Sequence, residues 1–140
     1  MRAFREAVEK RDLDAVEALL AEDVVFTSPV VFKPYTGRAM TAAILRAVAQ
    51  VFEDFRYTRE LEGGDGRDHA LVFTARVGDR EIEGCDFLHV GADGLIDALT
   101  VMVRPLSGAQ ALAAAMGARF DEIAQRAQTG QGARSAGRTR

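Results

Sequence analysis

The chain has 140 residues, 48% of them hydrophobic and 28% charged, with a formal net charge of −3. This length suits one domain that buries enough apolar surface to fold without disulfides. One cysteine and two histidines do not make a metal site, so we expect no metal and no cofactor. The charge balance, the lack of a long apolar run and the charged N-terminus argue against nucleic-acid binding, membrane insertion and secretion, and we expect a cytoplasmic protein.

The first half of the sequence predicts helices around one short strand. Apolar residues at helical spacing predict two helices, over about 2–11 and 13–21, with Asp12 as the N-cap of the second. A β-branched and aromatic run at 24–27 predicts a strand, and the prolines that follow it predict a loop. An apolar helical face then predicts a third helix, from about Arg38 to Val51.

The second half alternates with a period of two, which is typical of strands. The predicted strands lie at about 55–61, 71–77, 80–90 and 95–104, and short turns between them predict an antiparallel meander. Ser107 and Gln110 have the spacing of a capping box and predict a C-terminal helix. Residues 128–140 lack large apolar side chains, so we expect a domain over 1–127 followed by a disordered tail. The element order predicts an α+β domain, with helices on one face of a bent sheet and a cavity at its open end.

Three segments resemble the nuclear-transport-factor-2-like superfamily, in particular its SnoaL-like and ketosteroid-isomerase branches. They are Asp12–Val30, Tyr35–Ile44 and Cys85–Val101. The resemblance implies the cone-shaped fold of that superfamily but no particular reaction, because one fold hosts many activities. A stretch at 99–120 looks like a bacterial subgroup that carries no reaction with it.

The resemblance also places three roles of the family's isomerases on this chain. Those enzymes use a carboxylate base, a tyrosine and a protonated aspartate. The matching positions are Ser28, Phe4 and Asp86, of which only Asp86 keeps the required group. We therefore expect no steroid isomerisation by that mechanism.

Two aspartates are the candidate catalytic residues. Strand alternation gives Asp86 apolar neighbours on its own face, where desolvation would raise its pKa and suit it to acid/base work. The alternative is that Asp86 faces solvent or only ties down a backbone amide or an arginine. A tight turn at 92–93 would place Asp97 opposite Leu88 on the same face, although the end of a strand is usually reached by water.

The two faces of the predicted sheet have different expected roles. The concave face and its surroundings should bind a small hydrophobic molecule, in a pocket formed by Phe4, Phe26, Ser28, Gly84, Leu88, Leu99 and Val101. The opposite face should form a homodimer interface through Cys85, Phe87, His89 and Met102. The predicted function is ligand binding with isomerase- or cyclase-like turnover, and the alternatives are a non-catalytic binding or carrier module and a dimeric interaction domain with an incidental pocket.

Overall fold

The computed structural model describes residues 1–121, so the predicted tail at 128–140 lies outside the described residues. The elements follow in the order α1 (Arg2–Glu9), α2 (Leu13–Ala18), β1 (Leu20–Thr27), β2 (Tyr35–Thr36), α3 (Arg38–Val51), β3 (Glu53–Glu62), β4 (Asp68–Val77), β5 (Arg80–Val90) and β6 (Ile96–Arg104). A further helix begins at 106 and continues to the last described residue, 121. None of the helices in this part of the chain is long and apolar enough to span a membrane.

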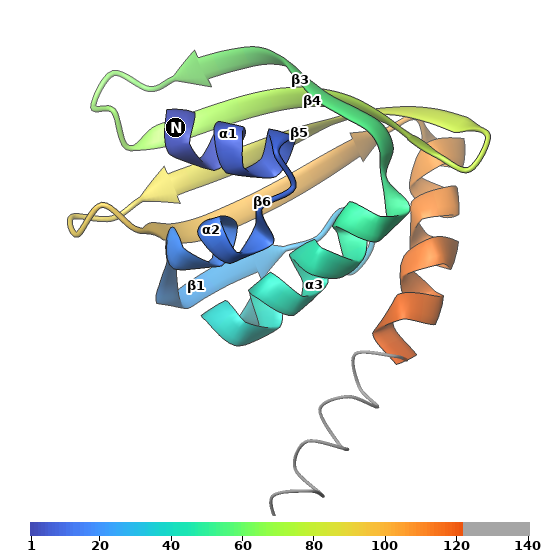
Figure 1. The fold of residues 1–140 in the computed structure, drawn as a ribbon, viewed down its shortest axis with the longest axis horizontal. Coiled ribbons are helices and arrows are strands. Elements are labelled where there is room, and N and C mark those ends of the chain that lie inside the picture. Colours follow the sequence, from blue (N-terminus) through green and yellow to red (C-terminus); the bar gives the residue numbers. More distant parts are fainter. Residues whose placement is uncertain (122–140) are drawn as a thin grey trace, which may run out of the picture.

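Within residues 1–121, six strands form one curved, mixed sheet in the order β2-β1-β6-β5-β4-β3. The meander from β3 to β6 is antiparallel, as predicted, and β1 joins it parallel to β6. Figure 1 shows α1, α2 and α3 on one face of this sheet, while the last helix leaves the end of β6. The α+β architecture predicted from the order of the elements is confirmed.

The boundary between α2 and β1 differs from the prediction. The helix expected to reach residue 21 ends at Ala18, and the strand expected at 24 begins at Leu20. The structural reason is pairing with β6, because Leu20 lies opposite Ile96, whose backbone N–H donates to the carbonyl oxygen of Leu19 at 2.9 Å. The predicted N-cap is confirmed, since the Asp12 side chain accepts a hydrogen bond from the backbone N–H of Ala15.

The segment predicted as a loop after the first strand contains the two-residue strand β2. Tyr35 lies opposite Phe26 on the edge of the sheet, and the ring of Tyr35 stacks on Phe120 of the last helix, with 5.8 Å between ring centroids. Gly37 then begins α3 with a φ of 111°, in the region that favours glycine. The bounds of α3 agree with the prediction.

The last helix does not begin with the predicted capping box. Its first helical residue is at 106, so Ser107 lies inside the first turn and is not the N-cap. That turn closes on the backbone, where the N–H of Ala109 donates to the carbonyl oxygen of Pro105 at 3.0 Å. Leu112 and Met116 of this helix are buried in the common core, so the helix is packed on the domain through an apolar stripe.

Candidate functional site

A cavity of about 320 Å³ lies between the concave face of the sheet and the helices, a size within the usual range of small-molecule pockets. Most of the side chains that line it are apolar. They are Phe4, Val8, Leu13, Val16, Phe26, Pro29, Leu45, Val48, Ala49, Phe52, Phe55, Phe73, Leu99, Val101 and Leu112, together with Glu9, Arg11, Asp54, Tyr57 and Asp86. The cavity therefore offers an apolar wall, part aliphatic and part aromatic, with a few polar groups.

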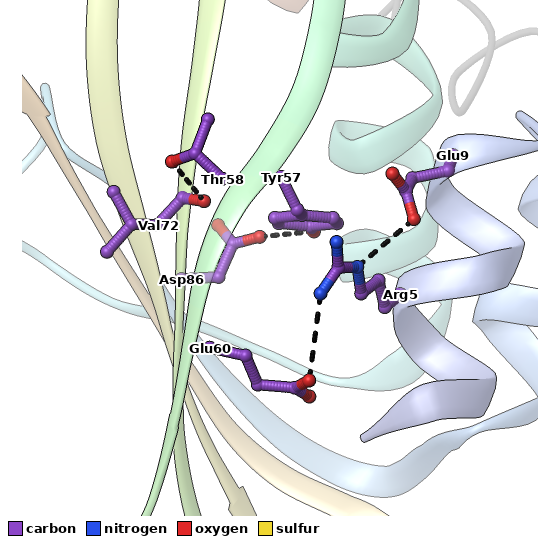
Figure 2. A network of polar contacts seen from close by, with 7 residues as sticks. All are labelled: Arg5, Glu9, Tyr57, Thr58, Glu60, Val72 and Asp86. Atoms are coloured by element: carbon purple, nitrogen blue, oxygen red, sulfur yellow. Dashed lines mark hydrogen bonds and ion pairs between the residues drawn. The ribbon is translucent and has the colours of Figure 1, made fainter.

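Two of those polar groups are buried and bonded to each other. Asp86 stands on β5 and is 8% exposed, and Tyr57 stands on β3 and is 5% exposed. The hydroxyl of Tyr57 donates a hydrogen bond to Oδ2 of Asp86 at 2.7 Å (Figure 2). Because β4 separates β3 from β5, this bond links two strands that do not pair with each other.

Burial controls the protonation of this pair. Loss of water around the carboxyl group raises the pKa of Asp86 to about 7, although the hydrogen bond from Tyr57 stabilises the carboxylate and lowers the pKa in part. Burial, followed by the negative charge of Asp86, raises the pKa of Tyr57 well above its ordinary value. Near neutral pH Tyr57 is thus a donor, while Asp86 is available both with and without its proton.

A charged group on α1 lies over the ring of Tyr57. The Arg5 guanidinium lies 6.0 Å from the centre of the Tyr57 ring, within the range of a cation–π contact. It also pairs with Glu9 at 3.2 Å and with Glu60 at 3.7 Å, as Figure 2 shows. The charge of Glu9 raises the pKa of Tyr57 and that of Arg5 lowers it, both less than burial does.

The opening of the cavity is marked by its three exposed lining residues, Glu9, Arg11 and Asp54. Asp54 bonds to the guanidinium of Arg76, which also pairs with Glu53. Arg11 and Asp54 have φ values of 58° and 53°, and they are the two non-glycine residues with a positive φ among residues 1–121. Such left-handed conformations are unfavourable for residues with a side chain. That of Arg11 follows the C-cap of α1, where a left-handed residue commonly ends a helix.

Five predicted site residues line the cavity and three do not. Phe4, Phe26, Leu99, Val101 and Asp86 line it. Ser28 is turned toward its own loop, where its hydroxyl accepts hydrogen bonds from the backbone N–H groups of residues 30 and 31. The backbone of Gly84 lies beneath the ring of Phe73, and Leu88 is a core residue that is 2% exposed.

The predicted position of Asp97 is wrong. Leu88 pairs with Leu99, and the register of β6 against β5 shifts between His89 and Val90, which leaves Asp97 as the extra residue of a β-bulge. A bulge re-aims its side chain, and the Oδ1 atom of Asp97 lies 2.6 Å from Nδ1 of His89 on the outer face. This contact raises the pKa of His89. Asp97 therefore does not share the cavity with Asp86.

The outer face of the sheet carries the other predicted cluster. Cys85 pairs with Met102, and Phe87 and Met102 are large apolar side chains that are 43% and 59% exposed. Figure 1 shows that α1, α2 and α3 all lie on the opposite face. The four predicted interface residues are thus on or near one exposed surface, and a second chain on it stays a prediction.

Tyr57 is the functional candidate that the sequence analysis missed. It stands at an alternating position of the strand predicted at 55–61, which by itself assigns it no functional role. A buried tyrosine hydroxyl usually needs a hydrogen-bond partner. Strand alternation had already placed Asp86 among apolar neighbours, so a tyrosine on another strand of the same sheet was an available signal for such a pair. The pairing itself could not be read from spacing, because the register of β3 against β4 is shifted by irregularities on both sides of the Arg56–Tyr57 segment.

Among residues 1–121, no three His, Cys, Asp or Glu side chains are grouped to hold a metal ion.

Comparison with known proteins identifies the family. The family model of the SnoaL-like domain matches residues 1–99, which is more than half of the chain. The chain belongs to the SnoaL-like domain family. Among curated proteins there is no significant match to this SnoaL-like domain.

Solved structures similar to this SnoaL-like domain include proteins named for isomerase chemistry. A steroid delta-isomerase from Pseudomonas aeruginosa is 44% identical, with a TM-score of 0.83 over 87% of this chain and 89% of that chain. An uncharacterized protein with a cystatin-like fold from Silicibacter pomeroyi DSS-3 is 39% identical, with a TM-score of 0.84 over 91% and 89% of the two chains. A putative ketosteroid isomerase from Kribbella flavida DSM 17836 is 32% identical, with a TM-score of 0.58 over 74% of each chain.

Proposed function

We propose that this SnoaL-like domain binds a small hydrophobic molecule in its cavity and transfers a proton on it through Asp86. The reaction class is isomerase- or cyclase-like and needs no cofactor. The observation that carries this proposal is the buried hydrogen bond of 2.7 Å between Tyr57 and Asp86 at the wall of an apolar cavity. A carboxyl group whose pKa is about 7 can both give and take a proton at neutral pH, which is the condition for efficient general acid/base catalysis.

Tyr57 has a distinct part in this proposal. Its raised pKa keeps the phenol protonated, so its hydroxyl donates to the carboxyl oxygen and fixes the orientation of Asp86. The apolar wall around the pair excludes water, which strengthens hydrogen bonds and charge interactions with a bound molecule. A carbonyl compound with an acidic neighbouring C–H bond is the substrate class that such a pair suits.

The names of two relatives support proton-transfer chemistry, but this chain lacks part of the isomerase machinery that the superfamily uses. Position 28 is a serine whose hydroxyl is bonded to its own loop, and position 4 is a phenylalanine with no hydroxyl. We therefore propose proton transfer on a different hydrophobic molecule. The same two positions favour the second candidate function, a non-catalytic binding or carrier module, since no carboxylate stands where the superfamily's base would be.

A deuterium-exchange experiment separates the two functions. Thermal-shift screening against hydrophobic polycyclic carbonyl compounds selects ligands, and each ligand is then incubated with the protein in deuterated buffer and followed by proton NMR. We expect deuterium to enter the carbon next to the carbonyl group with the parent protein and not with Asp86→Asn, while both proteins bind. Binding without exchange in the parent protein supports the carrier module. If no ligand produces a thermal shift, the result supports the remaining alternative, a dimeric interaction domain with an incidental pocket.

We also propose that two copies of the domain associate through the outer face of the sheet, around Phe87, His89 and Met102. Exposed apolar side chains that gather on one uncovered face usually mark an association site. In a homodimer this surface would contact its own copy across a two-fold axis.

A further inference from the structure

We propose that the molecule bound in the cavity carries a carboxylate, and that Arg11 holds this group at the opening while the apolar body of the molecule fills the cavity. This inference rests on the proposed function, because it concerns the ligand of the same site. It names the substrate class as an apolar, monoanionic carboxylic acid.

The charges at the opening are not all compensated. Of the three exposed lining residues, Glu9 pairs with Arg5 at 3.2 Å and Asp54 is bonded to Arg76. Arg11 has no carboxylate within ion-pair distance among residues 1–121. Its guanidinium donates instead to the backbone carbonyl oxygen of Ala49, which also lines the cavity. Because an arginine has five N–H donors, most of them stay available to an anion at this position.

The backbone holds Arg11 at the opening in the left-handed position that commonly follows the end of a helix, here α1. Its φ of 58° lies in the left-handed region, where glycine or asparagine is the favoured residue. Two backbone hydrogen bonds fix this turn between α1 and α2, from the N–H of Arg11 to Val8 at 3.0 Å and from the N–H of Asp12 to Ala7 at 2.9 Å. The arginine side chain is not needed to make the turn, so its presence at the opening is better explained by what it contacts.

The surroundings of Arg11 decide which anion it suits. An ionised group is strongly disfavoured against the apolar wall, so the charge of the ligand should stay at the exposed opening and its apolar part should enter. Glu9 and Asp54 line the same opening but are already paired with Arg5 and Arg76, which leaves the single positive charge of Arg11 for a ligand to match. A carboxylate brings one negative charge, whereas a phosphate monoester brings between about 1.5 and 2 at neutral pH. The planar fork of the guanidinium also matches the two oxygens of a carboxylate.

Calorimetric titration with an acid and its neutral isostere tests this inference. The ligands are naphthaleneacetic acid and naphthaleneacetamide, which have the same ring and nearly the same size and differ in charge. We expect the parent protein to bind the acid about fivefold more tightly than the amide, as befits one exposed ion pair. Arg11→Gln should abolish this preference without weakening amide binding, and Arg11→Lys should keep most of it. Arg80→Gln, which removes an exposed arginine at the start of β5, is the matched control and should keep the full preference.

The outcomes separate this inference from the proposed function. If acid and amide bind the parent protein equally, and Val48→Phe in the cavity wall weakens both, the cavity binds apolar molecules and the role of Arg11 is wrong. If neither ligand binds the parent protein, both proposals are overturned. A preference for the acid that survives Arg11→Gln would place the anion elsewhere. A preference that does not weaken between about 0.01 M and about 1 M salt would contradict an ion pair at the exposed opening.

Discussion

The hydroxyl of Tyr57 donates to the carboxyl group of Asp86 at 2.7 Å, although the two residues stand on strands that are separated by β4. The register explains how this is possible. Tyr57 lies opposite Phe73, which lies opposite Gly84, and Asp86 is two residues farther along β5 on the same face. Because Gly84 has no side chain, the ring of Phe73 settles over it, and a Cβ atom there would come within 2.3 Å of that ring. The aspartate and the tyrosine thus meet at the cavity wall beside this ring.

Replacing Asp86 with asparagine should change the pH dependence of stability. The raised pKa means that the folded protein keeps a proton that the unfolded chain loses above about pH 4. The stabilising contribution of this group is therefore present below the unfolded pKa and is lost as the pH rises through about 7. Urea unfolding should show Asp86→Asn to be more stable than the parent protein above pH 7. The difference in free energy of unfolding between the variant and the parent should shift in favour of the variant by at least about 1.4 kcal/mol between pH 4 and pH 7. Asp79→Asn in the β4–β5 turn is the control, and a pH-independent difference for Asp86→Asn would contradict the prediction.

Replacing Tyr57 with phenylalanine should raise the pKa of Asp86 further. The hydrogen bond from the phenol is the contact that stabilises the carboxylate, and removing it leaves burial unopposed. Carboxyl NMR titration should place the Asp86 midpoint above that of the parent protein, with a loss of about 1 kcal/mol in the free energy of unfolding. Tyr35→Phe, at a tyrosine outside the cavity, should leave the midpoint unchanged. An unchanged midpoint in Tyr57→Phe would mean that the bond is not kept in solution.

Adding one methyl group at Gly84 should disturb the cavity wall. The new Cβ would lie 2.7 Å from the carbonyl oxygen of Met102 as well as against the Phe73 ring, and the backbone of the neighbouring strand cannot easily move away. We expect Gly84→Ala to lower the free energy of unfolding by about 1–3 kcal/mol and to weaken ligand binding. Gly64→Ala, where nothing lies within 4 Å, should change stability by less than about 0.5 kcal/mol. Equal stability of the two variants would show that the sheet adapts to the extra methyl group.

Light scattering should show a dimer at micromolar concentration, and Phe87→Glu should convert it to a monomer. A buried contact tolerates an unpaired carboxylate poorly, so a charge on the outer face should dissociate the two copies. Phe32→Glu is the matched control, since Phe32 is 99% exposed on another part of the molecule. A monomeric parent protein, or dimers that persist in Phe87→Glu, would rule out this interface.

A β,γ-unsaturated ketosteroid should not be isomerised above the background rate. Proton transfer by a positioned base contributes roughly 10²–10⁴-fold, and position 28 has a serine that is bonded to its own loop. The measurement is the ultraviolet absorbance of the conjugated product over time. Turnover that disappears in Asp86→Asn would show instead that Asp86 acts as the base from the opposite wall, and the function would then be steroid isomerisation.

The sequence by itself determined most of the elements and which of their residues share a face, although not the boundary between α2 and β1 or the short strand β2. The period of 3.6 gave α3 its bounds, and the alternation along 80–90 put Asp86 and Phe87 on opposite faces of their strand, while the family resemblance implied which of these faces is covered. These features depend on local geometry, because helix and strand periods fix which neighbours share a face. The resemblance to the superfamily was sufficient to predict the family, and the match of the SnoaL-like family model to residues 1–99 confirms that prediction.

Only the tertiary structure decided which side chains meet. The pairing of β1 with β6 turned residues predicted as the end of a helix into a strand, and a bulge moved Asp97 from the cavity to His89. The partner of Asp86 lies 29 residues earlier in the sequence, and the opening brings together Arg11 from the turn between α1 and α2 and Asp54 from the start of β3. Such contacts depend on strand register, bulges and packing between distant segments. Periodicity does not fix them, because the alternating pattern is kept when one strand slides by two residues along another.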